Sequence, residues 1–360
     1  MKPRVGDRGE ELRRLVGRTV VDDDELELGD RLAQHARDRE PEVTRAVVHG
    51  DEDGDQRRFG AGHGASVRRV ASAELPSFDL VVATVDRVEE PGRLLGSLER
   101  QTHRGFRVLL VDQNDDDRLD GVLDERRSLE VVRLRSGRGL SRARNAALAQ
   151  VRSDLVGFPD DDCVLPDDLL ERVASRFAAD PELDGLTGRA ADTQGRSSRS
   201  WARDPATLTR DNLWNRAISF TIFLRRSAVA RTGEFDGQLG LGSRSPWSSG
   251  EEIDYLVRAV DDGARIDYDP SMVVVHEDKA LTPTALRAVG ARDGASIGYI
   301  LRKHGYPSRS VAPMLVRPVG GALLALARGD RRRLSFHVAT LRGRMRGYRM
   351  RARSSAKTSE

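Results

Sequence analysis

Three consecutive carboxylates, Asp160, Asp161 and Asp162, offer the residue types best suited to chemistry in this sequence of 360 residues. They follow an apolar run at 155–158 and precede a helix start at Pro166, so they stand at the carboxyl end of a predicted strand. Ligands bind at that edge of open α/β sheets. In extended backbone, Asp160 and Asp162 point the same way and Asp161 points the other way.

Two carboxylates this close both ionise at low cost only when a cation lies between them. Oxygen ligands suit Mg²⁺ or Mn²⁺, which complete their shell with phosphate oxygens and water. The Asp160-x-Asp162 spacing therefore predicts a site for a metal and a diphosphate. The alternative is an acidic, solvated turn that caps the next helix. Burial of these acids against arginines, or a direction away from any cavity, would count against an enzyme.

The elements that must position these acids alternate between strand and helix. The predicted strands are 78–85, 106–112, 129–134, 155–158 and 186–188, with two more short strands in 265–275. Helical spacing appears from 94 to 98, from 141 to 151 and from 250 to 259. This order predicts an α/β protein with a Rossmann-like sheet that is mixed but mostly parallel, and helices on both faces.

The composition is that of a soluble α/β protein, with 5% aromatic residues. A single cysteine, Cys163, excludes an internal disulfide and a Cys-rich zinc site, and it fits a reducing compartment. The N-terminus lacks an apolar core of signal-peptide length. We expect no stretch to cross a bilayer, because the best candidate, 311–327, carries Arg317 and Pro318.

Four further motifs occur in a fixed order around the acids. They are Val81-Val-Ala-Thr-Val-Asp-Arg87 with Leu98-Glu-Arg-Gln101, then Val108-Leu-Leu-Val-Asp112, then Gly139-Leu-Ser-Arg-Ala-Arg-Asn145, and finally Gly250-Glu-Glu-Ile-Asp254. Together they resemble the family-2 glycosyltransferases, inverting enzymes with the GT-A fold. The resemblance covers roughly 78–280. Two departures are Asp112-Gln113-Asn114, where the family has Asp-Asp-Gly, and Glu252, where Asp is usual.

The resemblance implies a role for each matching residue. The implied donor-binding residues are Thr84, Asp86, Arg87, Asp112, Asn114, Gly139, Arg144, Asn145, Asp160 and Asp161. The implied metal ligands for Mn²⁺ or Mg²⁺ are Asp160, Asp162 and His276. Glu252 would be the general base, with Glu251 as its neighbour on the helix. Asp112 and Asn145 have local alternatives, a helix cap and a turn cap. Trp214 and Trp247 can stack on an acceptor sugar, or they belong to the core.

The implied reaction is metal-dependent transfer of a sugar, with inversion, from a nucleotide-diphosphate sugar to a hydroxyl. The acceptor would be a carbohydrate or a lipid-linked molecule, as in cell envelope polysaccharide. One alternative is a sugar-nucleotide pyrophosphorylase, which would want a Gly-rich basic loop where this chain has Asp86-Arg87-Val88. Another is a nucleotide- or membrane-binding module without catalysis. The implied domains are an appendage at 1–76, a GT-A domain at 77–290 with its halves meeting at 165, and a basic helical region at 291–360.

The end of the chain is strongly basic. Residues 301–360 hold fifteen lysines and arginines against two acids, a net charge of +13, so the preceding 300 residues carry −10 of the total of +3. Within 331–353 one helical face is apolar: Leu334, Val338, Leu341, Met345 and Tyr348. This helix either lies on an anionic membrane surface or packs on the catalytic domain, and the apolar stripe argues against nucleic acid. We expect a cytoplasmic protein, peripheral on the inner face of the plasma membrane if the helix binds there.

Overall fold

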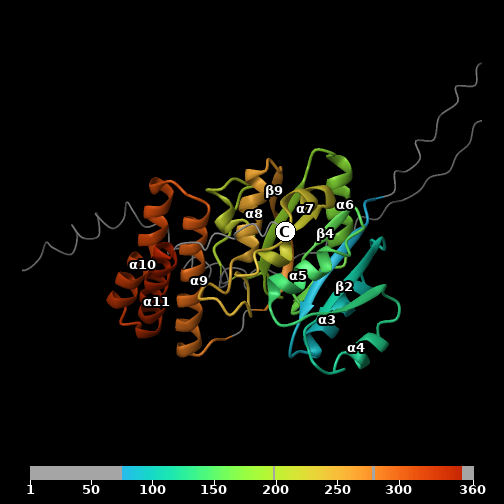
Figure 1. The fold of residues 1–360 in the computed structure, drawn as a ribbon, viewed down its shortest axis with the longest axis horizontal. Helices are drawn as coiled ribbons and strands as arrows, with labels where there is room; N and C mark the ends of the chain where they lie inside the picture. The colour runs from blue at the N-terminus through green and yellow to red at the C-terminus, as the bar shows by residue number, and fades with distance from the viewer. Residues whose placement is uncertain (1–74, 198, 278–279, 351–360) are drawn as a thin grey trace, which may run out of the picture. The chain divides into compact units, whose positions relative to one another are not determined.

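The structure is a computed structural model that describes residues 75–197, 199–277 and 280–350 (Figure 1). The appendage expected at 1–76 therefore lies outside the described residues except for its last two positions. The described chain forms one compact unit that begins at residue 74.

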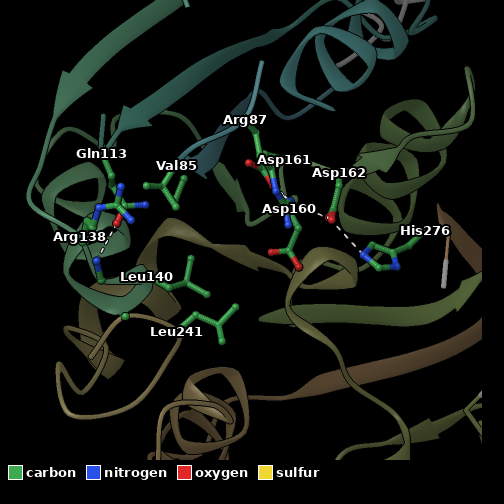
Figure 2. A pocket seen from close by; sticks show the side chains of 13 residues that line it. Val85, Arg87, Gln113, Arg138, Leu140, Asp160, Asp161, Asp162, Leu241 and His276 are labelled. Atoms are coloured by element: carbon green, nitrogen blue, oxygen red, sulfur yellow. Dashed lines mark hydrogen bonds and ion pairs between the residues drawn. The ribbon is translucent and has the colours of Figure 1, made fainter. Parts of the chain in front are cut away.

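The first half of the sheet is parallel, as predicted. Its strands are β1 (Phe78–Thr84), β2 (Phe106–Asp112), β3 (Val131–Arg135) and β4 (Leu155–Gly157), in the order β3-β2-β1-β4. Thr84 pairs with Asp112, so β1 and β2 end level with each other. This common edge carries the side chains that Figure 2 shows around a cavity.

The second half of the sheet is mixed. Beyond β4 the order continues with β8 (Phe223–Arg225), β6 (Gly185–Ala191), β9 (Ile266–His276) and β5 (Cys163–Val164), and β7 (Ala206–Thr207) also pairs with β9. β8 is antiparallel to both of its neighbours, whereas β6 and β9 are parallel. β9 is one strand with a shifted register beside Gly188, where two short strands were predicted.

Helices cover both faces of the sheet because β1 alternates its apolar side chains between them. Leu80 and Val82 join a core with α3 (Glu89–Glu99) and α6 (Leu169–Ala179). Val81 joins a second core with α5 (Leu140–Leu148) and α8 (Glu251–Asp261). The remaining short elements are α4 (Asp120–Asp124), α7 (Arg226–Thr232) and the 3₁₀ turns η2 (Leu213–Asn215) and η3 (Ser219–Thr221).

Three long helices follow the sheet: α9 (Pro283–Lys303), α10 (Ser308–Ala327) and α11 (Arg331–Arg349). They pack side by side, with α11 in contact with both others (Figure 1). A Cβ at Gly347 would overlap the backbone of α9, so glycine there permits the close approach. The face that α11 buries is Ala339, Thr340, Gly343 and Gly347, whereas the predicted apolar stripe is only half-buried. α11 therefore packs on α9 and α10, and it does so through a different face from the predicted stripe.

α10 corrects the expectation that no stretch could cross a bilayer. Among the described helices it alone is long and apolar enough to do so, with only 17% of its most apolar window buried. Val316, Val319, Leu323 and Leu326 are exposed on it. Length and composition are the whole of that finding, and a soluble protein's helix can meet the same criterion.

Candidate active site

A cavity of about 450 Å³ opens at the edge where β1, β2 and β4 end (Figure 2). The strands end at the same height there, so the loops that follow them form the walls of the cavity. Its lining residues are Ala83, Val85, Arg87, Gln113, Arg138, Gly139, Leu140, Asp160, Asp161, Asp162, Leu241, Gly242 and His276. The three predicted acids thus share one cavity with three other predicted residues, Arg87, Gly139 and His276.

Asp161 and Asp162 share the guanidinium of Arg87. Arg87 NH1 lies 2.5 Å from Asp161 Oδ1 and 2.9 Å from Asp162 Oδ2. The hydroxyl of Thr84 also donates to Asp161 at 2.6 Å. The predicted alternation is therefore wrong. The chain turns at these residues instead of staying extended, because the backbone N–H of Cys163 donates to the carbonyl of Asp160.

Asp160 points into different surroundings from its two neighbours. Its carboxylate accepts a hydrogen bond from Arg144 NH2 at 3.1 Å and another from the hydroxyl of Ser219 at 3.2 Å. Burial raises the pKa of Asp160 to about 6, and the charge of Arg144 opposes that rise. Ser219 has no motif around it, so sequence patterns give no signal for it.

His276 lies next to Asp162, with Nε2 3.2 Å from Asp162 Oδ1 (Figure 2). Its ring stacks on Phe220 with centroids 4.9 Å apart, which fixes its orientation. One carboxylate oxygen and one imidazole nitrogen form a donor set that Mn²⁺ or Mg²⁺ accepts when phosphate and water supply the other ligands. No group of three or more such side chains is placed around a common point within the described ranges. The pair therefore fits a metal, while the expected triad with Asp160 is not assembled.

The surroundings of the three acids meet one of the two conditions that would count against an enzyme. The three acids do contact arginines, Arg87 and Arg144, which is one of the two unfavourable conditions. They also line the cavity, so the other condition is not met. The guanidinium group of Arg87 already pairs with Asp161 and Asp162. A metal would therefore have to compete with Arg87 for Asp162.

Arg144 and Glu251 form an ion pair beneath the cavity. Both side chains are buried, and Arg144 NH1 lies 2.9 Å from Glu251 Oε1. Arg144 also lies over the ring of Phe235 at 5.5 Å. Arg144 thus holds both Glu251 and Asp160 through its guanidinium group. The expected roles of Arg144 at a diphosphate and of Glu251 in catalysis stay predictions.

Asn145 is also a structural residue here. Its amide nitrogen donates to the carbonyl of Phe235 at 2.9 Å, and its amide oxygen accepts from the N–H of Phe235 at 2.8 Å. Both ends of the amide are thus used by the loop after α7. The turn-cap alternative fits this geometry better than donor binding.

Asp112 does not reach the cavity. It is fully buried and accepts hydrogen bonds from Arg133 at 2.6 Å and 2.9 Å and from the N–H of Asn114 at 2.9 Å. Burial would raise the pKa of Asp112, but these hydrogen bonds outweigh it and lower the pKa. Asn114 in turn accepts from the N–H of Asp86 at 2.7 Å. In this structure Asp112 supports the loop at Asp86 through Asn114, and its expected contact with a base stays a prediction.

The start of α5 forms the wall opposite the acids. Gly139 has φ of +138°, a conformation that other residues rarely adopt, and its N–H donates to the side chain of Gln113 at 2.7 Å. Arg138 lines the cavity beside it and pairs with Asp86 at 2.7 Å. Gln113 and Arg138 were not singled out by the sequence, although each adjoins a motif residue.

Glu252 lies in a recess next to the cavity, not in it. The first turn of α8 places it half-buried beside Arg144, Phe158, Ser219 and Tyr255. Burial and the neighbouring charge of Glu251 raise the pKa of Glu252 to about 8. The deprotonated form of such a group is a stronger base than an ordinary carboxylate, and its share grows as the pH rises toward 8. Ser219 and Arg144 contact both Asp160 and this recess, so the two sites share a wall.

The two tryptophans expected at an acceptor site are packing residues. Trp247 is 7% exposed and stacks on Tyr299 with centroids 4.3 Å apart. Trp214 packs edge-on against Tyr306 and donates its indole N–H to the carbonyl of Arg210. Neither lines the cavity or the recess of Glu252. The core alternative is therefore the one that the structure supports.

Comparison with known proteins gives a consistent class. Residues 79–231 match glycosyl transferase family 2. The chain is 28% identical over 266 residues to the pre-mycofactocin glycosyltransferase of Mycobacterium tuberculosis, which covers 67% of this chain and 52% of that protein. It is 37% identical over 124 residues to the beta-monoglucosyldiacylglycerol synthase of Synechocystis sp., which covers 32% of this chain and 26% of that protein. The chain thus spans about half the length, or less, of these curated relatives.

One solved structure extends the likeness to the fold. The mannosyltransferase PcManGT from Pyrobaculum calidifontis, in complex with GDP-Man and Mn²⁺, aligns with a TM-score of 0.54 at 15% identity. The alignment covers 76% of this chain and 88% of that one. At this identity the likeness concerns the fold alone. The arginine contacts of the acids count against the metal assignment, and the fold likeness does not change that. The class of enzyme rests on the sequence matches.

Proposed function

Because residues 79–231 belong to glycosyl transferase family 2 and the sheet has the GT-A fold, we propose that this enzyme transfers a sugar, with inversion, from a nucleotide-diphosphate sugar to a hydroxyl. The observation that carries the proposal is the cavity in which Asp160, Asp161, Asp162 and His276 meet at the carboxyl ends of the parallel strands. The GDP-Man and Mn²⁺ in the similar mannosyltransferase support such a donor and metal here.

Asp162 and His276 are the residues that would hold a divalent ion. Such an ion would neutralise the charge that develops on the leaving diphosphate. Arg87 and Arg138 line the same cavity and add two guanidinium groups that can bind phosphate oxygens. No protein acid is needed to protonate the leaving group in this arrangement.

Glu252 is the proposed base. The oxygen of the acceptor hydroxyl bonds to the anomeric carbon, and the hydroxyl proton passes to the carboxylate of Glu252. The bond from that carbon to the diphosphate oxygen breaks at the same time, on the opposite face, and this inverts the configuration. The raised pKa of Glu252 and its position in a recess beside Asp160 support this role.

The acceptor is proposed to be a carbohydrate or a lipid-linked molecule. One relative is named for a glycolipid, monoglucosyldiacylglycerol, and the other for pre-mycofactocin. The basic helix α11 supports a cytoplasmic enzyme with contact to an anionic membrane surface. Nucleic acid is not proposed as a partner.

The proposal is tested with the purified chain and a panel of UDP-, GDP- and TDP-sugars in the presence of Mn²⁺. A true donor should raise the melting temperature by mass action and be hydrolysed slowly to the nucleoside diphosphate. Transfer to an acceptor should give the inverted anomer by NMR. If no donor in the panel shifts the melting temperature or is hydrolysed, the transferase assignment fails for this chain.

The pH dependence of transfer should follow Glu252. Its carboxylate must be deprotonated to act as a base, and its pKa is raised from 4.5 to about 8. We therefore expect kcat/KM to fall about tenfold per pH unit below about pH 8 and to level off above it. The measurement is a kcat/KM profile from pH 6 to 9.5 at saturating Mn²⁺. A profile that is flat between pH 6 and 9 would contradict the role of this residue.

A further inference from the structure

A second hollow lies outside the donor cavity, between α9 and α11. It is a groove of about 960 Å³, and Pro246 and Ser248 also line it. Part of its lining is small and apolar, with Ala288, Val289 and Ala295 from α9 and Val338 from α11.

Five arginines line this groove: Arg287, Arg292, Arg331, Arg342 and Arg346. No carboxylate is among the described lining residues. Arg292 pairs with Asp293 at 2.8 Å, and the other four have no ion-pair partner in the part of the chain that the structure describes. Single exposed arginines are common on helices, but here unpaired guanidinium groups converge on one apolar groove from two different helices.

The chemistry of the groove selects for an anion that is attached to an apolar body. Guanidinium groups bind phosphate oxygens in a bidentate manner, and four unpaired ones repel each other until an anion binds. The alanine, valine and leucine side chains suit an acyl chain. Base stacking is not available, because no aromatic side chain is among the described lining residues. A phospholipid therefore fits better than a nucleic acid.

We propose that the groove between α9 and α11 binds the phosphate head group of an anionic phospholipid at a bilayer surface, with an acyl chain along its apolar lining. The phospholipid would be the membrane partner of the proposed glycosyltransferase. Lipid binding in the groove does not depend on transfer activity. The groove uses Leu334 and Val338 of the predicted apolar stripe, and it adds residues of α9 that the sequence did not indicate.

The groove also has a structural link to the catalytic cavity. The loop that precedes α8 contributes Leu241 and Gly242 to the cavity and Pro246 and Ser248 to the groove. The hydroxyl of Ser249 donates to that of Ser296 on α9 at 2.9 Å. A lipid bound in the groove would thus contact the loop that leads to Glu252.

The test is co-sedimentation of the full chain with sucrose-loaded vesicles of phosphatidylcholine alone or with 30% phosphatidylglycerol. Wild type should bind the phosphatidylglycerol vesicles and bind phosphatidylcholine weakly. The double variant Arg342→Gln, Arg346→Gln should lose about 30-fold in partitioning, because each arginine near an anionic surface adds roughly a factor of five. Neither side chain has an ion-pair partner in the described ranges, so the variant should keep the wild-type melting temperature.

The matched control is Arg309→Gln, Arg317→Gln on α10, which removes the same charge outside the groove. It should lose less than about threefold in partitioning. Equal losses in the two double variants would mean diffuse attraction and would overturn the groove. Equal binding of wild type to both kinds of vesicle would overturn it as well. Release of the protein from the vesicles by a single-stranded RNA oligonucleotide at equal phosphate concentration would favour nucleic acid and would also overturn it.

Discussion

Replacing Glu252 with glutamine is expected to lower kcat of transfer by about a thousandfold, within the range that a positioned base contributes. Glutamine has nearly the same shape and can be accommodated in the recess formed by Phe158, Ser219 and Tyr255, but it cannot accept the proton of the acceptor hydroxyl. Because the recess is separate from the donor cavity, affinity for the nucleoside diphosphate should stay within about twofold. Steady-state transfer assays together with calorimetric titration of the nucleotide measure both quantities.

Glu252→Asp is the matched control for this variant. Aspartate keeps the carboxylate and is the acid that the resembled family usually has at this position. We expect it to retain transfer well above the level of the glutamine variant. Its only change is a side chain shorter by one methylene, which alters the distance from the carboxylate to the acceptor hydroxyl. Wild-type turnover by Glu252→Gln would remove the assigned base and leave Asp160 as the remaining carboxylate beside the recess.

The second large effect concerns stability. Asp254 on α8 is fully buried and meets three cationic or ionisable groups: Lys303 at 2.6 Å, His304 at 2.8 Å and Arg258 at 3.2 Å. Asp254→Asn removes the carboxylate that all three groups share, and only Lys303 keeps another one, Asp236 at 2.7 Å, among the described contacts of these three groups. Breaking a buried pair costs about 3–5 kcal/mol, and we expect about 3 kcal/mol because Lys303 and Arg258 keep some exposure to water. Urea unfolding at pH 7 measures the loss.

The pH dependence of this contribution has a definite sign. Burial would raise the pKa of Asp254, but His304, Lys303 and Arg258 outweigh it and lower the pKa to about 2. Its stabilisation is therefore present above the ordinary value of 3.8 and is lost as pH falls toward 2. The control is Asp261→Asn, whose exposed pair with Arg210 should contribute less than about 1 kcal/mol. Equal stability of wild type and Asp254→Asn would show that the cluster does not link α8 to α9.

Strand periodicity and motif order predict where the acids lie. The apolar runs at 78–85, 106–112 and 155–158 place Arg87 and the three acids at one edge of a parallel sheet, and the structure has β1, β2 and β4 there. The second, mixed half of the sheet could not be predicted strand by strand in the same way. Its strands β5, β7 and β8 have two or three residues each, which is too short for any period to show.

The roles of buried polar residues were the least predictable part. Asp112, Arg144 and Asn145 have residue types suited to a nucleotide, but each is satisfied by a protein partner, two of them far along the chain: Glu251 for Arg144 and Phe235 for Asn145. A local pattern does not indicate such long-range pairing. Helical spacing on α11 failed for a related reason, because glycines and Ala339, not the larger apolar residues, form the face that packs on α9.

The central claim is that Asp162, at the rim of the sheet, holds a divalent ion that binds the diphosphate of the donor. The most direct test is calorimetric titration of UDP and GDP into wild type and Asp162→Asn, each with Mn²⁺ and with EDTA. We predict that Mn²⁺ tightens nucleotide binding to wild type at least about tenfold and has no such effect on the variant. If each nucleotide binds wild type equally well in Mn²⁺ and in EDTA, or if Mn²⁺ tightens binding to Asp162→Asn as much as to wild type, the claim is contradicted.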